Sequence, residues 1–239
     1  MTKKRILLKV TGRIFCDPVT GFLSTALLDA LLGDIAFLQY EKQTHQFGIV
    51  IGGGNLFRGS TGYTQIGVTE SAAHEIGMLA TVMNGLIIAD RARSLSIPHR
   101  HFSGIALSFC GATDPSAESI QNALSKDELL LFSGGTGAPF VTTDTAAVIR
   151  ALQMGATEIW KGTDVSGVYN ADPKKNSDAY KFDQITYQYL LERGIDVMDQ
   201  GAYALCQKYK RMIRVFSLLN QGALLQAAVD ESFGTKISF

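Results

Sequence analysis

Three cationic side chains in this sequence stand at the ends of predicted strands or in the loops that follow them. Lys9 ends the first predicted strand, Lys161 ends a later one, and Arg58 follows a glycine-rich loop. Phosphoryl transfer depends on positioning and on neutralising negative charge, so placed cations are the groups that it requires. Each cation alone is typical of a solvated surface charge. Together they predict one cleft at the carboxyl edge of a sheet.

One carboxylate, Asp144, accompanies these cations. It lies in the first turn of the helix predicted over 143–154, where the helix dipole favours a negative charge. Two interpretations stay open at this point: a capping carboxylate, or an acceptor that orients two lysines. No serine or cysteine stands with a base in a pattern that would activate it as a nucleophile, which favours direct transfer without a covalent enzyme intermediate.

Two glycine-rich loops each follow a buried apolar run and precede a helix, at 52–55 and 134–137. Glycines there let the backbone approach a phosphate, and successive N–H groups form an anion-binding nest. The alternative is a pair of tight turns that bind nothing. The P-loop pattern, a GxGxxG dinucleotide fingerprint and the protein-kinase motifs are all absent from the sequence, so a phosphate-binding protein of another design is indicated.

The elements that must position these residues alternate short apolar runs with amphipathic stretches, a pattern typical of α/β domains with a largely parallel sheet. The predicted strands are 5–10, 47–51, 99–102, 107–110, 129–133, 158–161, 213–217 and 235–238. The predicted helices are 25–42, 72–94, 115–124, 143–154 and 223–229. No linker, repeat or low-complexity segment interrupts the pattern, so residues 1–239 are expected to form one domain.

The composition argues against several classes of protein. Lys plus Arg equals Asp plus Glu, 22 of each, so a broad nucleic-acid-binding surface is not expected. Three cysteines without a CxxC pair argue against a disulfide framework or zinc site and favour reduced thiols in a cytoplasmic protein. Lys9 interrupts the first apolar run, so no signal peptide is predicted, and no run approaches the ~20 apolar residues of a membrane helix.

Segments spread over nearly the whole chain resemble, in order, those of bacterial uridylate kinases, a group within the amino-acid-kinase superfamily. The most specific of them is GMLATVMNGL at 77–86. The others are GGGNLFRG at 52–59, GTGAPF at 135–140, TTD at 142–144, GVYNADP at 167–173, IRVF at 213–216 and GT at 234–235.

The resemblance implies a three-layer α/β/α sandwich with a central, mainly parallel sheet. It implies a kinase that moves the γ-phosphoryl group of ATP to UMP in pyrimidine nucleotide biosynthesis, with the UMP site in the N-terminal half and the ATP site in the C-terminal half. Mg²⁺ would enter with ATP, bound mostly by phosphates and water. Members of this group assemble as hexamers built from dimers and respond to GTP and UTP, so both properties are expected here.

The roles implied by the resemblance fall into three groups. Lys9 would neutralise charge on the transferred group, Asp144 would organise the catalytic lysines, and Lys161 would contact the ATP phosphates. The residues implied at the UMP site are Gly53, Gly54, Arg58, His74, Thr136 and Thr143. The residues implied at the ATP site are Lys9, Gly12, Lys161, Thr163, Tyr169 and Asp172.

Four positions near these sites depart from the pattern of the family. Arg13 stands where a glutamate is usual, and Ser166 stands where an aspartate is usual. His74 replaces an aspartate that bonds the ribose hydroxyls of UMP, and Ala138 replaces an asparagine. The first two changes fall on the ATP side and the last two on the UMP side.

The effector response and the metal content rest on other residues. Ala89 and Arg93 replace residues that help to form the GTP pocket of the family, whereas Arg100 matches a basic position there. His99 and His101 share one side of a predicted strand but lack a third ligand nearby, so no metal site is predicted.

Two alternatives stand beside a UMP kinase. A relative that phosphorylates a carboxylate, a carbamate or another phosphate is opposed by the 77–86 run and by Arg58. A non-catalytic binding or storage protein on the same scaffold would be indicated by loss of the two lysines or of Asp144, and all three are present. The changes at His74 and Ala138 keep that second alternative open.

Overall fold

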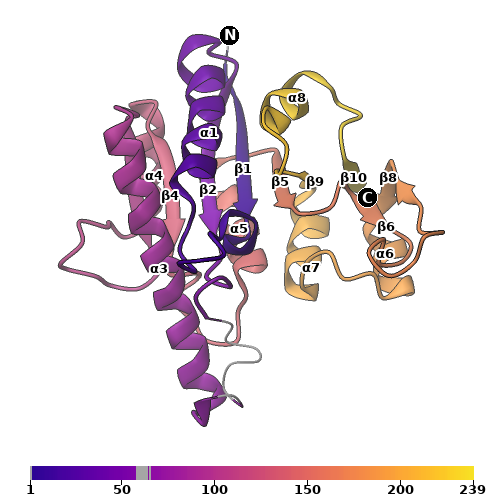
Figure 1. The fold of residues 1–239 in the computed structure, drawn as a ribbon. Coiled ribbons are helices and arrows are strands. Elements are labelled where there is room, and N and C mark those ends of the chain that lie inside the picture. Colours follow the sequence, from indigo (N-terminus) through magenta and orange to yellow (C-terminus); the bar gives the residue numbers. More distant parts are fainter. Residues whose placement is uncertain (1, 58–63, 65) are drawn as a thin grey trace.

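A sheet of eight strands forms the centre of the molecule, in the order β3-β4-β2-β1-β5-β9-β10-β8 (Figure 1). The computed structural model describes residues 2–57, 64 and 66–239. Neighbouring strands are parallel except for β9 and β10, which are antiparallel. The strands are β1 (Lys4–Val10), β2 (His45–Ile51), β3 (His99–Ser103), β4 (Leu129–Ser133), β5 (Glu158–Thr163), β8 (Gln184–Thr186), β9 (Met212–Ser217) and β10 (Thr235–Ser238), with a separate ribbon of β6 (Val168–Tyr169) and β7 (Lys181–Phe182).

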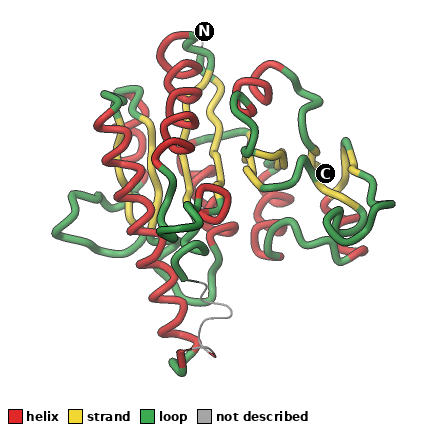
Figure 2. Tube along the Cα trace, in the orientation of Figure 1, coloured by secondary structure: helices red, strands yellow, loops and turns green. Residues whose placement is uncertain are grey.

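Helices cover both faces of this sheet because its strands are apolar on both sides. In β1, Leu7 lies in one core, whereas Ile6 and Leu8 lie in the other, and all three are fully buried. The first core contains residues of α4, α5, α6 and α7, and the second contains residues of α1, α3 and α8. The three-layer α/β/α sandwich is therefore confirmed, and its helices and strands can be followed in Figure 2.

Most of the longer helices begin at a residue that caps them. The hydroxyls of Thr69, Ser116 and Thr142 accept hydrogen bonds from backbone N–H groups in the first turns of α3, α4 and α5. Gly155 ends α5 in the left-handed conformation that glycine favours, with φ 70°. The helices are α1 (Thr25–Ala36), α3 (Glu70–Ser94), α4 (Ala117–Ser125), α5 (Thr143–Met154), α6 (Tyr187–Arg193), α7 (Gln200–Tyr209) and α8 (Ala223–Val229), with a 3₁₀ turn η1 (Gly12–Phe15) and a π-helical turn η2 (Phe37–Glu41).

Several predicted elements need correction. The strand predicted at 107–110 is wrong: these residues form a loop beyond the edge strand β3, and Phe109 is 82% exposed. An isolated bridge between Phe102 and Thr113 joins the end of this loop to β3. The helix predicted from Pro115 begins at Ala117, because the capping side chain is that of Ser116. The helices α6 and α7 were not predicted.

The long helix α3 is apolar enough to meet a length-and-hydropathy criterion for a membrane span, which the sequence analysis did not predict. Half of the apolar window is buried inside the fold. Ala73, Ala80 and Ile88 lie on its buried side. A core helix of an ordinary globular domain meets the same criterion, so this observation is only a weak indication of a membrane span.

Candidate active site

Lys9, Asp144 and Lys161 form a tight ion cluster at the carboxyl edge of the sheet. Lys9 and Lys161 are register partners on the adjacent parallel strands β1 and β5, so their side chains leave the sheet together. Lys9 Nζ lies 2.7 Å from Asp144 Oδ1, and Lys161 Nζ lies 3.0 Å from Asp144 Oδ2. Lys161 Nζ also donates to the backbone carbonyl of Val197. The two lysines and the carboxylate that the sequence singled out are thus brought into direct contact.

Burial and neighbouring charges set the protonation of this cluster. Burial opposes ionisation of Asp144, but the ammonium groups of Lys9 and Lys161 outweigh it and hold the pKa of the carboxyl below its ordinary value. Burial, followed by repulsion from Lys9, lowers the pKa of Lys161 from 10.5 to about 8. At neutral pH the cluster therefore carries two positive charges and one negative charge. Its net positive charge lies where water screens it poorly.

The start of α5 is held by a carboxylate that the sequence analysis missed. Asp199 caps α7 by accepting a hydrogen bond from the N–H of Ala202 at 2.8 Å. It also accepts from the N–H and the hydroxyl of Thr145, at 3.2 and 2.6 Å, and from the hydroxyl of Thr142. One side chain thus fixes the first turns of two helices, and Asp144 lies in one of those turns. Its position just before an uninterrupted helical segment was the available sequence signal.

The floor of the site is built by a buried amide on α3. The side-chain N–H₂ of Asn84 donates to the Gly52 carbonyl at 2.8 Å and to Asn55 Oδ1 at 2.7 Å. The N–H of Gly52 donates to the Val10 carbonyl at 2.9 Å, which ties the glycine loop to the end of β1. A Cβ atom on Gly12 would lie 2.1 Å from Asn55 Oδ1, so this close approach requires glycine.

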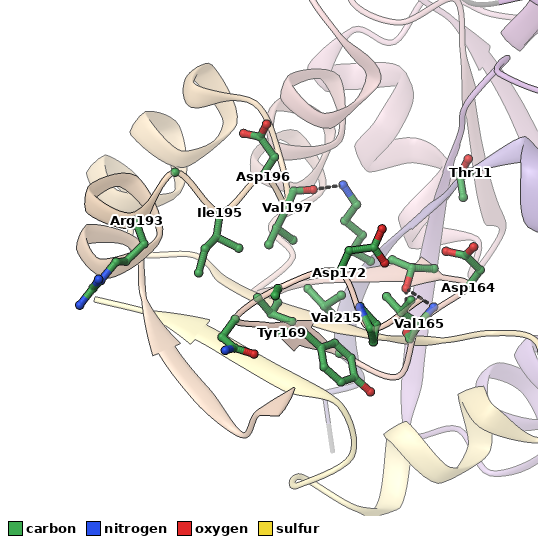
Figure 3. A pocket seen from close by; sticks show the side chains of 18 of the residues that line it. Thr11, Asp164, Val165, Tyr169, Asp172, Arg193, Ile195, Asp196, Val197 and Val215 are labelled. Atoms are coloured by element: carbon green, nitrogen blue, oxygen red, sulfur yellow. Dashed lines mark hydrogen bonds between the residues drawn. The ribbon is translucent and has the colours of Figure 1, made fainter. Parts of the chain in front are cut away.

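A cavity of about 690 Å³ opens beside the two lysines (Figure 3). Its lining includes five of the six residues assigned to the ATP site from the sequence: Lys9, Lys161, Thr163, Tyr169 and Asp172. Gly12 is not among its lining residues, but Thr11 and Arg13 on either side of it are. We call this space the donor cavity.

One wall of the donor cavity comes from a segment to which the sequence analysis gave no role. Arg193, Ile195, Asp196 and Val197 connect α6 to α7 and line the cavity together with Tyr169 (Figure 3). The apolar side chains of Ile195 and Val197 face the same space as the Tyr169 ring. Apolar walls with a few polar groups suit a planar nucleobase.

A second cavity, of about 230 Å³, lies on the other side of the start of α5, and we call it the acceptor cavity. Its lining includes four of the residues assigned to UMP: Gly53, Gly54, His74 and Thr143. The His74 ring packs against the Phe140 ring with centroids 5.0 Å apart. Thr143 lines this cavity, and its chain neighbour Asp144 contacts the two lysines that line the other, so the start of α5 links the two cavities.

Two residues assigned to UMP are not placed in this cavity. Thr136 lies in the second glycine loop, where its hydroxyl accepts a hydrogen bond from the N–H of Ala138 at 3.3 Å, and it is not among the lining residues. Arg58 lies outside the described residues. The contacts predicted for these two residues stay predictions.

The two histidines on β3 have protein partners. His99 Nδ1 lies 2.9 Å from the Ile97 carbonyl, and His101 Nε2 lies 2.8 Å from the Ser133 hydroxyl. Burial lowers the pKa of His101 to about 4, so this ring is neutral at physiological pH. Within residues 2–57, 64 and 66–239, no group of three or more His, Cys, Asp or Glu side chains is arranged to hold a metal ion.

Comparison with known proteins gives consistent matches over the whole chain. Residues 4–217 match the amino acid kinase family. Uridylate kinases of Legionella pneumophila (strain Corby) and Serratia proteamaculans (strain 568) are 40% and 41% identical over 233 and 236 residues, covering 97% and 98% of this chain and 93% and 96% of their own. The crystal structures of UMP kinase from Ureaplasma parvum and Bacillus anthracis superpose with TM-scores of 0.90 and 0.91, at 30% and 29% identity, over 100% of this chain and 100% and 97% of theirs.

Proposed function

The chain belongs to the amino acid kinase family, and from this membership and the geometry of the site we propose that it is a UMP kinase. It transfers the γ-phosphoryl group of ATP to the phosphate of UMP, giving ADP and UDP. The observation that carries the proposal is the ion cluster of Lys9, Asp144 and Lys161 at the start of α5. The two lysines line the donor cavity, and Thr143, next to Asp144 in the chain, is among the residues that line the acceptor cavity.

The reaction is a direct in-line displacement. An oxygen of the UMP phosphate, already anionic at neutral pH, attacks the γ-phosphorus of ATP. The new P–O bond forms as the bond from the γ-phosphorus to the β,γ-bridging oxygen breaks, and ADP leaves with that electron pair. The step requires no general base and no covalent enzyme intermediate, so the protein contributes positioning and positive charge.

The two lysines supply that charge from fixed positions. Lys9 stabilises the phosphoryl group in flight, and Lys161 neutralises charge on the ATP phosphates. Asp144 holds both ammonium groups within 3.0 Å of its oxygens, and its charge favours the protonated form of Lys161. Preorganised charge in a poorly solvated site stabilises a transition state because little has to reorganise as the reaction proceeds.

The acceptor cavity is suited to a small phosphorylated nucleoside. Gly53 and Gly54 line it just after the end of β2, where an anion nest of their backbone N–H groups would bind the phosphate of UMP. A Cβ on Gly53 would lie 2.8 Å from the Cβ of Ala80, so this loop is packed closely onto α3. His74, on the first turns of α3, offers a ring nitrogen to the sugar.

Mg²⁺ accompanies the donor nucleotide in this proposal and neutralises charge on its phosphate oxygens. Asp164, Asp172 and Asp196 line the donor cavity, so carboxylates are available beside the phosphates that would hold such an ion. Asp164 is already paired with Lys174 at 2.6 Å. An ion held mainly by phosphates and water suits this arrangement better than an all-protein cage.

The test is ADP release from Mg·ATP with UMP, CMP, dUMP or no acceptor. Turnover with UMP above the no-acceptor rate is the expected result. Tight ATP binding without turnover on any of these acceptors would overturn the proposal and leave the non-catalytic alternative. Turnover that requires a carboxylate or carbamate acceptor would instead indicate a different kinase of the same family.

We further propose how the chain assembles, where it acts and where an effector binds. The chain acts as a homohexamer, supported by the exposed apolar side chains of Leu79 and Met83 on α3. It acts in the cytoplasm, supported by three cysteines that form no disulfide. A hollow of about 610 Å³ lined by Arg93, His99 and Arg100 is the candidate site for a GTP or UTP effector. Light scattering of the purified chain and ADP release with added GTP or UTP test these points.

A further inference from the structure

Arg13 is a cation at the mouth of the donor cavity, on the turn that directly follows Lys9. It lies in η1, where its neighbours Gly12, Ile14 and Phe15 are all buried while Arg13 itself is exposed. The burial of these neighbours fixes the direction in which the arginine leaves the backbone. Its side chain lines the same cavity as Lys9 and Lys161.

The backbone that carries Arg13 is held on both sides. The N–H of Ile14 donates to the Thr11 carbonyl at 3.3 Å, and the N–H of Cys16 donates to the Arg13 carbonyl at 3.3 Å. Gly12 fits against Asn55 so closely that no side chain is tolerated there. A side chain on so fixed a turn loses less entropy when it binds a ligand than one on a loose loop.

The charge of Arg13 has no partner of its own within the part of the chain that the structure describes, where it forms no ion pair and no side-chain hydrogen bond. Asp164, a carboxylate on which the charge of Arg13 acts, is paired with Lys174 at 2.6 Å. The hydrogen bond from Lys174, with a smaller contribution from the charge of Arg13, lowers the pKa of Asp164. The guanidinium of Arg13 therefore lies beside the donor cavity and has no ion-pair partner among the described residues.

The ion cluster alone carries little net positive charge for binding a polyphosphate. Lys9 and Lys161 share the single carboxylate of Asp144, so the cluster offers one net positive charge to a polyphosphate. We infer that Arg13 is a further binding residue of this enzyme, whose guanidinium contacts the polyphosphate of the donor nucleotide. The planar fork of N–H donors suits two phosphate oxygens at once. This inference rests on the proposed function, because it takes ATP as the occupant of the donor cavity.

The experiment measures the Kd of ATP, ADP and AMP by calorimetry, without acceptor, for the unmodified protein and for Arg13→Gln, Arg13→Lys and Arg13→Glu. We expect Arg13→Gln to weaken ATP binding about tenfold, ADP binding less and AMP binding less than about twofold. Arg13→Lys should recover part of the lost ATP affinity because it keeps the positive charge. Arg13→Glu should weaken ATP binding more than Arg13→Gln does. The KM of UMP stays unchanged.

A matched control removes the same charge elsewhere. Lys126 is exposed at the end of α4, just before the amino end of β4, and Lys126→Gln should leave all three Kd values unchanged. An unchanged Kd of ATP in Arg13→Gln, or equal losses for ATP and AMP, would overturn the inference. If the unmodified protein turns over UMP while Arg13→Gln binds ATP normally, the inference fails and the proposed function stands. If Arg13→Gln weakens ATP binding but no turnover with UMP occurs, the contact is supported and the proposed function fails.

Discussion

Asp144 links the stability of the ion cluster to the proposed chemistry. Its carboxylate is largely buried, so it would be costly to ionise alone, yet it contacts two ammonium groups that are equally costly to bury. The cluster is stable because the charge of each partner offsets the cost of burying the charges of the others. Removing the carboxylate leaves two like charges within one poorly solvated space, which raises the cost of protonating Lys161.

This reasoning predicts the behaviour of Asp144→Asn. The amide keeps the shape of the side chain but not its charge, so the protein should still fold while kcat falls by about 10²–10³-fold. Steady-state kinetics with ATP and UMP, together with a thermal melt that confirms a folded variant, measure the effect. A variant that keeps the normal kcat would remove Asp144 from the mechanism.

The lowered pKa of Lys161 predicts a pH dependence. Its ammonium is protonated below about 8 and loses its charge as the pH rises through that value, whereas an unperturbed lysine stays charged up to 10.5. The kcat/KM for ATP should therefore decline above about pH 8, because that constant reports the free enzyme. A profile that stays flat to pH 10 would contradict the assignment.

The same shift affects stability with the opposite sign. Between about 8 and 10.5 the unfolded chain binds the proton of Lys161 more tightly than the native protein does. The contribution of this group to the free energy of unfolding therefore rises with pH across that window. Below about pH 8 the destabilisation caused by burying the charged lysine is fully present. Loss of activity above pH 8 should thus not be accompanied by unfolding, which circular dichroism at each pH would check.

At the scale of elements, the joint between α5 and α7 positions the ion cluster. Asp199 accepts hydrogen bonds from both helices, and its negative charge is one of the influences that keep the pKa of Lys161 from falling further. Asp199→Asn retains an oxygen that can cap α7 but removes the charge. We expect a thermal midpoint close to normal, a kcat about tenfold lower, and a decline of kcat/KM that begins at lower pH.

Asp199→Ala separates the positioning role from the capping role. It removes the cap as well as the charge, so it should also cost about 1 kcal/mol of stability. A pH profile that is the same in Asp199→Asn and in the unmodified protein would reduce Asp199 to a purely structural residue. The pH profile is therefore the decisive measurement, since a structural role alone would not move it.

The same elements show what the sequence could predict and what it could not. Lys9 and Lys161 were placed correctly because each ends a strongly apolar run, and parallel strands present their carboxyl ends at one edge. The segment 187–209 was left without elements because its helices α6 and α7 are short and mix apolar with polar residues. Asp199 was not recognised as a cap because the helix that it precedes was not predicted. In addition, its partners Thr142 and Thr145 are distant in sequence, and only the tertiary fold brings them together.

The strand predicted at 107–110 fails for a related reason. Its apolar residues satisfy the local pattern of a strand, but β3 is the edge of the sheet in the described structure and no neighbouring strand lies beyond it. Without a partner for its backbone groups, such a run remains a loop. Local patterns thus identify residues that prefer a strand, whereas the topology decides whether a place in the sheet exists.

At the scale of the whole molecule, α3 carries an apolar stripe that its own fold does not cover. Leu79 and Met83 are separated by one helical turn and are 49% and 47% exposed, while Ala80 and Asn84 beside them are buried against the sheet. The residues of α3 that line the acceptor cavity, among them His74, Met78 and Thr81, lie on a different face of the helix from Leu79 and Met83. A surface of this kind is typical of an interface between copies of a chain.

The proposed hexamer therefore predicts a defined response to charge on this stripe. Leu79→Glu combined with Met83→Glu should lower the molar mass measured by light scattering from about six times the 25.9 kDa of the chain to that of a smaller species. Val229→Glu, at a residue that is 83% exposed on α8, adds the same charge elsewhere and should leave the assembly intact. Retention of the full mass in the α3 variant would exclude this stripe as an interface, and a monomeric unmodified protein would overturn the hexamer itself.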